Sequence, residues 1–194
     1  MLPASEDFQI SIARSLMAGE LIVLPTETVY GIAGLYGKPG VKEKIYELKN
    51  RDRGKPLQVL VGSADVLGEF NAELSEKGRA LIGRFWPGPL TLVLRCGEGR
   101  CIGFRYPDHP VVRSVLNGVQ GALYATSANL SGEPPVRDAR QAVADFKGKV
   151  GGIITAEGRF DGEPSTVILM ENGDWKILRR GALCGEMEEF LKKR

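Results

Sequence analysis

Two short polar segments carry side chains of the kind that bind small polar molecules. PTETVYG occupies 25–31 and ATSANLSG occupies 125–132, and each directly follows an apolar run. Their hydroxyl and amide groups both donate and accept hydrogen bonds, so they suit a carboxylate, a ribose or a phosphate. Loops at strand ends commonly place binding side chains. The alternatives are a turn that caps the next helix for the first segment and an ordinary Ser/Asn turn for the second.

A basic cluster separates these two segments. Residues 42–55 contain six basic and three acidic side chains. Lys49, Arg51 and Lys55 fall where a helical pattern ends and an apolar run begins, so from a turn they can converge on one phosphate group. A plain basic surface is the alternative reading.

Arginines elsewhere offer further anion contacts. Arg105 ends a short apolar run before a proline-bounded loop, a position suited to a bidentate clamp on a carboxylate. Arg179 and Arg180 close the last apolar run, either at a site or as a surface pair. His109 is the only histidine, and we expect it in a loop or at a helix start. A Ser-His-Asp triad is therefore poorly supported.

Familiar cofactor and metal motifs are missing from the sequence. The glycines of 31–37 are spaced GxxGxxG and not GxGxxG, and Lys38 is followed by proline, so the phosphate-loop pattern fails as well. Cys96, Cys101 and Cys184 lack CxxC spacing and a nearby histidine, which predicts reduced thiols and no metal site. Any ATP must be held by another arrangement.

Composition predicts one globular domain over residues 1–194. The chain is 43% hydrophobic and 26% charged, with a net charge of +2, which is too mild for a bulk nucleic-acid coat protein. The amino-terminal residues lack the pattern of a secretory signal, and the apolar runs are far shorter than a membrane span. We therefore expect a cytoplasmic protein without a membrane partner.

Periodicity predicts a mixed α/β fold. Helical spacing covers 5–18, with Ser5 as cap and Gly19 as stop, and returns at 41–50 and 74–86. Residues 186–194 read as a short charged helix or tail. The pair 166–169 and 175–178 around Asn172-Gly173 predicts an antiparallel hairpin. Other strands are expected at 21–24, 57–61, 90–94, 122–125 and 153–155.

Together, the motifs resemble the YrdC-like threonylcarbamoyl-AMP synthase family across almost the whole chain. The motifs in order are PTETVYG, LKNR at 48–51, KPLQVLV at 55–61, FWPGPLTLVL at 85–94, RYPDHP at 105–110, ATSANLSG, PSTV at 164–167 and ILRRG at 177–181. The resemblance implies a twisted open mixed sheet with helices around a large concave cavity. It also implies the short, single-domain form, without the extra carboxyl-terminal domain of longer relatives.

The activity implied is condensation of L-threonine, bicarbonate and ATP into threonylcarbamoyl-adenylate with release of pyrophosphate. This step leads, through a downstream threonylcarbamoyl transferase, to threonylcarbamoyl-adenosine at position 37 of certain tRNAs. Lys49 and Arg51, with a magnesium ion carried by the nucleotide, would neutralise charge during the reaction. By the same resemblance, threonine is held by Thr28, Arg105, Ser127 and Ser165, and ATP by Lys49, Arg51, Lys55, Asn129, Arg137 and Arg179.

Some assignments and functions stay open at this point. Thr166 could serve instead of Ser165, and Arg180 instead of Arg179. Many longer relatives have a histidine where this sequence has Leu60, so that contact is absent or replaced. Two other functions compete: a module that binds double-stranded RNA or tRNA through phosphate contacts, and a paralogue that uses another acyl acceptor.

Overall fold

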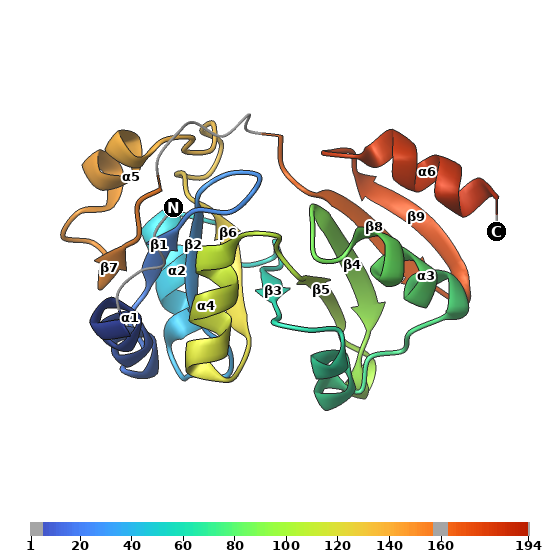
Figure 1. Cartoon of the computed structure of the whole chain (residues 1–194), viewed down its shortest axis with the longest axis horizontal. Helices are drawn as coiled ribbons and strands as arrows, with labels where there is room; N and C mark the ends of the chain where they lie inside the picture. The colour runs from blue at the N-terminus through green and yellow to red at the C-terminus, as the bar shows by residue number, and fades with distance from the viewer. Residues whose placement is uncertain (1–5, 157–162, 194) are drawn as a thin grey trace.

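In the computed structural model, which describes residues 6–156 and 163–193, nine strands form one mixed sheet (Figure 1). The strand order is β7-β1-β2-β6-β3-β5-β4-β8-β9, with both parallel and antiparallel neighbours. The expected mixed sheet is therefore confirmed. The strands are β1 Ile22–Leu24, β2 Gly31–Leu35, β3 Gln58–Leu60, β4 Leu90–Arg95, β5 Cys101–Arg105, β6 Leu123–Ser127, β7 Gly152–Ile153, β8 Thr166–Glu171 and β9 Asp174–Arg179.

The predicted helices are present. Gly19, with a φ of 81°, follows the first helix as expected, whereas the predicted cap Ser5 lies outside the described residues. In the described part of the chain, no helix is both long and apolar enough to cross a bilayer. The helices are α1 Glu6–Met17, α2 Val41–Lys49, α3 Glu76–Phe85, α4 Pro110–Val119, α5 Ala139–Phe146 and α6 Cys184–Lys192, with 3₁₀ turns at Asp65–Phe70 and Gly97–Gly99.

Four of these strands and α-helices were not predicted from the sequence. In β2, the glycines at 31 and 34 resemble turn residues, yet the strand pairs with both β1 and β6. A strand built on glycine is favoured here by close packing, because a Cβ on Gly34 would lie 2.5 Å from Val41 Cγ1. The strand β5 and the helices α4 and α5 were also not predicted, although His109 does stand at the start of α4 as expected.

The predicted hairpin is confirmed and forms one end of the sheet. The strands β8 and β9 are antiparallel, and both turn residues, Asn172 and Gly173, have positive φ values of 51° and 80°. Such a pair matches the right-handed twist of the flanking strands. A register irregularity between Val167 and Ile168, near the start of β8, leaves an extra residue, Leu178, on β9.

In the described part of the chain, helices cover only one face of the half of the sheet that contains β4, β5 and β8. Residues of even number, such as Leu92, Phe104 and Ile168, pack in a core with α3 and α6. Their odd-numbered neighbours, such as Thr91 and Gly103, face the other way and line a cavity. The two-residue period of each strand thus separates core from cavity.

The other half of the sheet lies between two helical layers (Figure 1). On one face, α1 and α4 pack against β1 and β6 through Leu16, Leu116 and Leu123. On the opposite face, α2 and α5 pack through Ile45 and Phe146. The layer formed by α1 and α4 ends beside β3, so the same face of the sheet continues uncovered into the cavity.

Close packing of β2 on α2 gives a stability prediction. Gly34→Ala places a methyl group against the buried, stiff side chain of Val41, so we expect the free energy of unfolding to fall by about 1–3 kcal/mol. Gly83→Ala is the matched control, because Gly83 is exposed in α3 and a Cβ there meets nothing within 4 Å. This control should be stabilised by roughly 0.5–1 kcal/mol. Equal changes in urea unfolding would contradict the packing argument.

Candidate functional site

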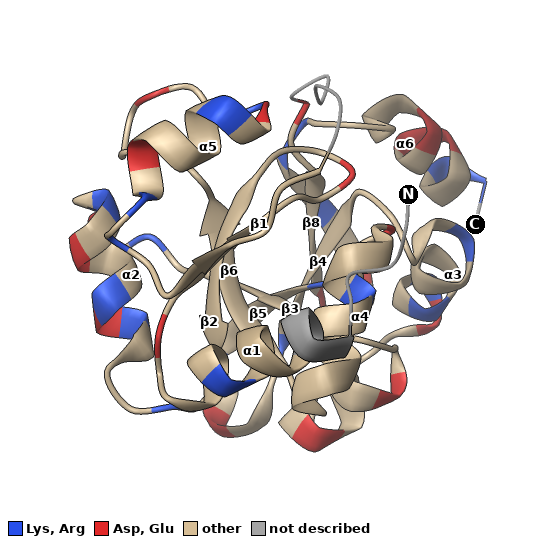
Figure 2. Ribbon diagram, turned by 60° about the vertical axis from the view of Figure 1, so that its left-hand side comes forward, with Lys and Arg blue, Asp and Glu red and all other residues tan. Residues whose placement is uncertain are grey.

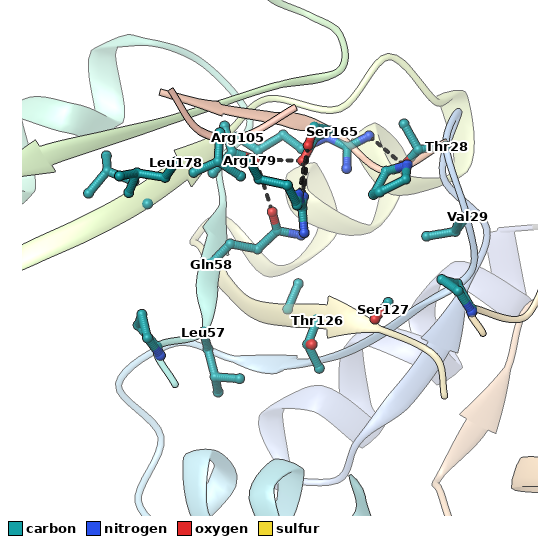
Figure 3. Close-up of a pocket in the computed structure, with 18 of the residues that line it drawn as sticks. Thr28, Val29, Leu57, Gln58, Arg105, Thr126, Ser127, Ser165, Leu178 and Arg179 are labelled. Carbon is teal, nitrogen blue, oxygen red and sulfur yellow. Dashed lines mark hydrogen bonds between the residues drawn. The ribbon is translucent and has the colours of Figure 1, made fainter. Parts of the chain in front are cut away.

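The uncovered face of the sheet forms a cavity of about 520 Å³, a size typical of small-molecule sites. One end is polar and the other is apolar, where Val93, Leu169 and Leu178 lie. Figure 3 shows side chains from β3, β5, β6 and β9 pointing into it. Its polar lining comprises Thr28, Arg51, Gln58, Thr91, Arg105, Thr126, Ser127, Ser165 and Arg179.

A buried arginine lies at the polar end of the cavity. The Arg105 side chain is only 3% exposed, and its Nη2 donates to Thr28 Oγ1 at 2.9 Å. The same nitrogen lies 2.8 Å from Glu27 Oε1. Thr28 is itself fixed by a 2.9 Å hydrogen bond to Thr26. Glu27 and Thr28 thus stabilise the buried guanidinium in a fixed position, from which it can also bind a second anion.

A second arginine, Arg179, lies close to this one at the end of β9. Its guanidinium donates to the carbonyl oxygen of Ser165 at 2.8 and 3.0 Å and to the hydroxyl of Ser165 at 2.9 Å. Burial lowers the pKa of Arg179, and the positive charges of Arg105 and Arg51 lower it further. Three positive charges gathered at one cavity favour an anionic ligand there.

The two open alternatives have different surroundings. Thr166 points away from the cavity and donates to the carbonyl of Ala182 at 2.9 Å. Arg180 is exposed and pairs with Glu188 on α6. The structure therefore brings Ser165 and Arg179, and not their neighbours, to the cavity wall.

Lys49 does not line the cavity but is buried behind the loop that follows β6. It is buried at 1% exposure, and its Nζ donates to the carbonyl oxygens of Ser127 and Asn129 and to Asn129 Oδ1. All three ammonium donors are thus used by the loop after β6. Asn129 also accepts from the Ser127 hydroxyl. Lys49 and Asn129 therefore shape the loop that carries Ser127 to the cavity.

The remaining predicted residues fall on either side of the cavity rim. Arg51 lines the cavity and donates to the carbonyl oxygen of Pro56 at 3.1 Å. Lys55 has an exposed side chain, and neither it nor Arg137 lines the cavity in the described structure. Leu60 is buried in the core against α4, so it makes no contact with the cavity.

Gln58, Thr91 and Glu27 were missed by the sequence analysis. Gln58 lies two positions before Leu60 in KPLQVLV and faces the cavity. Thr91 lies in FWPGPLTLVL, where every second residue of the strand faces the cavity. The period of two could have identified both once the cavity face was known. Glu27 lies within PTETVYG, but only the fold brings it to Arg105.

Other titratable groups near the cavity do not form a metal site. Burial lowers the pKa of His109, which favours its neutral form. Within residues 6–156 and 163–193, no three His, Cys, Asp or Glu side chains are grouped so as to hold a metal ion. The chemistry of this face is therefore built from arginines, hydroxyls and amides.

The buried lysine gives a pH-dependent prediction. Burial, with a smaller effect of Arg51, lowers the pKa of Lys49 to about 8. Between that value and the usual pKa of about 10.4, the unfolded chain binds more protons than the folded chain, so the contribution of Lys49 to stability rises with pH. We would measure the free energy of unfolding in urea for the wild type and Lys49→Met between pH 7.5 and 10. With rising pH, the free energy of unfolding of the wild type should increase relative to that of the variant. A constant difference would contradict this assignment.

Comparisons with known proteins place the chain in one family. A family model described as "Telomere recombination" (Sua5_yciO_yrdC) matches residues 14–181. The threonylcarbamoyl-AMP synthase of Bacillus subtilis is 32% identical over 97% of this chain, and that of Pyrococcus abyssi is 33% identical over 96%. This chain covers 58% and 57% of those two proteins, so it spans little more than half of their length.

Solved structures share the fold. The structure of Pyrococcus abyssi Sua5 complexed with L-threonine has a TM-score of 0.89 at 32% identity, covering 97% of this chain and 58% of that one. Escherichia coli YciO has a TM-score of 0.84 at 19% identity and covers 93% of this chain and 92% of its own, which supports the fold alone. The expected YrdC-like fold is confirmed, and the chain belongs to the family of Sua5, YciO and YrdC.

Proposed function

We propose that this chain is a threonylcarbamoyl-AMP synthase, which forms threonylcarbamoyl-adenylate and pyrophosphate from L-threonine, bicarbonate and ATP. The observation that carries the proposal is the convergence of Arg105, Thr28, Ser165 and Arg179 on one cavity. It is supported by similarity to a Sua5 whose structure contains L-threonine. Residues 1–194 would act as one domain, and the product would pass to a threonylcarbamoyl transferase acting on tRNA in the cytoplasm.

L-Threonine fits the polar end of the cavity. Arg105 supplies a planar guanidinium for the carboxylate, and its Nε has no hydrogen-bond partner among the described residues. Thr28, Ser127 and Ser165 supply hydroxyls for the polar atoms of the amino acid. This arrangement would orient threonine with its amine toward the cavity interior.

ATP fits beside the amino acid. Arg51 and Arg179 would neutralise the phosphates, and the loop held by Lys49 and Asn129 would shape the wall next to them. Because the ammonium of Lys49 already has three acceptors, its contribution would be to position the loop. Lys55 and Arg137 would reach the nucleotide only from the rim. A magnesium ion bound to the phosphates would add positive charge at the leaving pyrophosphate.

The chemistry requires no strong protein base. The neutral amine of threonine forms a carbamate either with carbon dioxide, releasing a proton to solvent, or with bicarbonate, releasing water. A carbamate oxygen is then already an anionic nucleophile. It forms a bond to the α-phosphorus as the bond to pyrophosphate breaks. The protein's contribution is alignment and neutralisation of the growing charge, which the arginines of this cavity provide.

The direct test is pyrophosphate release with ATP, magnesium and bicarbonate, with and without L-threonine. Release that depends on threonine supports the proposal. Release with serine or valine at equal efficiency would instead favour a paralogue with another acceptor, although one methyl group discriminates by only about 1–3 kcal/mol. On α2, basic and acidic residues are interspersed (Figure 2), so this helix does not present a uniformly basic face. RNA affinity that falls steeply with salt, without nucleotide turnover, would favour an RNA-binding module.

Arg51 should contribute to the reaction itself. Arg51→Ala should reduce threonine-dependent pyrophosphate release at least ~100-fold, as expected for loss of one preorganised donor. Arg53→Ala is the matched control, since the Arg53 side chain is 70% exposed and pairs with the equally exposed Glu47 at 3.8 Å. Its activity should stay within about twofold, because such surface pairs contribute little. Near-normal activity of Arg51→Ala would remove Arg51 from the mechanism.

Arg105 should control threonine binding. Arg105→Lys keeps the charge but loses the planar fork, so we expect the KM for threonine to rise by roughly 10- to 100-fold. Arg113→Lys serves as control, because Arg113 pairs with Asp108 on the exposed surface of α4. Steady-state kinetics with ATP saturating would separate the two variants. Equal KM values for both would disprove the carboxylate clamp.

A further inference from the structure

Gln58 stands on the floor of the cavity with space on both sides. Its register partners are Gly103 on β5 and Ala125 on β6, and both of these small residues also line the cavity. Figure 3 shows the Gln58 side chain extending toward Ser165 and Arg179. The amide is therefore accessible to a ligand, and the proposed function does not yet use it.

Hydrogen bonding determines which end of the amide meets the ligand. A guanidinium has only donors, so the Ser165 hydroxyl accepts from Arg179 Nη2 at 2.9 Å. The single proton of that hydroxyl is then available to Thr91 Oγ1, 2.8 Å away. Thr91 in turn donates its own proton to Gln58 Oε1 at 3.1 Å. The donor-only guanidinium of Arg179 thus determines the direction of every hydrogen bond in this chain.

With its oxygen occupied, Gln58 presents its NH₂ group to the cavity. That nitrogen has no hydrogen-bond partner among the described residues, so two donors remain available. Arg105 and Arg179 line the same cavity. A fixed NH₂ group beside two guanidinium groups matches an oxygen atom that carries negative charge.

We propose that Gln58 is a specificity-determining residue that donates a hydrogen bond to a carboxylate-type oxygen of the amino-acid substrate. That oxygen belongs either to the carboxylate of L-threonine or to the carbamate formed on its amine, since both present the same planar acceptor. The inference rests on the proposed function. It adds Gln58 to the residues that bind the substrate. The hydrogen bonds from Arg179 through Ser165 and Thr91 fix the orientation of its amide.

The test replaces the NH₂ group by oxygen at nearly constant size. In Gln58→Glu, Thr91 can still donate to one oxygen, while the other repels an anionic ligand. We expect the Kd for L-threonine, measured by calorimetry without bicarbonate, to rise at least about 10-fold if the carboxylate is the partner. If the carbamate is the partner, the KM for bicarbonate should rise by the same factor. Either result supports the proposal.

Two further variants make the test decisive. Gln141→Glu makes the same change on the exposed surface of α5 and should leave both constants within twofold. Gln58→Met removes the donors without adding charge, and it decides the question if Gln58→Glu does not fold. Folded variants at Gln58 with both constants within twofold of the wild type would overturn the inference alone. A wild type without threonine-dependent pyrophosphate release would overturn the proposed function and this inference together.

Discussion

Among the residues that the structure describes, no helix covers one face of β4, β5 and β8, and the site depends on this constraint. The opposite face of these strands is buried under α3 and α6, so alternate residues are forced outward into the cavity. The open face carries polar residues such as Thr91 and Arg105 at one end and apolar residues such as Val93 and Leu169 at the other. The period of the strands thus decides which residues face the cavity, and the residue types at those positions decide its polarity. Arg105, Ser165 and Thr91 owe their shared orientation to that period.

Two arginines, the buried Arg105 and the more exposed Arg179, give this wall its chemical character. Desolvation of a guanidinium is costly unless the charge is compensated, and Arg105 is compensated by Glu27 and Thr28. Arg179 is held by Ser165, which in turn begins the hydrogen-bond chain to Gln58. Each cation is thereby fixed before a ligand arrives, so little reorganisation is needed on binding. Lys49 does not line the cavity, and its three donors instead hold the loop next to Ser127.

Much of the fold followed from local pattern, because long amphipathic helices and a hairpin turn are encoded by neighbouring residues. The strand β2 did not, since its glycines are explained only by the closeness of Val41. At the site, the resemblance identified Thr28, Arg105, Ser165 and Arg179, which the structure places together. Gln58 and Glu27 could not be found in this way. Their roles depend on register partners and on a contact to a residue far along the chain.

The central claim is that this open face joins threonine, bicarbonate and the adenylate of ATP. The most direct measurement is mass spectrometry of the nucleotide products formed by the wild-type protein from ¹³C-bicarbonate, ATP, magnesium and L-threonine. The account predicts an adenylate that carries both the threonyl group and one ¹³C atom, and that is absent when threonine is omitted. Pyrophosphate release without a ¹³C-labelled threonyl adenylate, or no such product from folded protein, would contradict it.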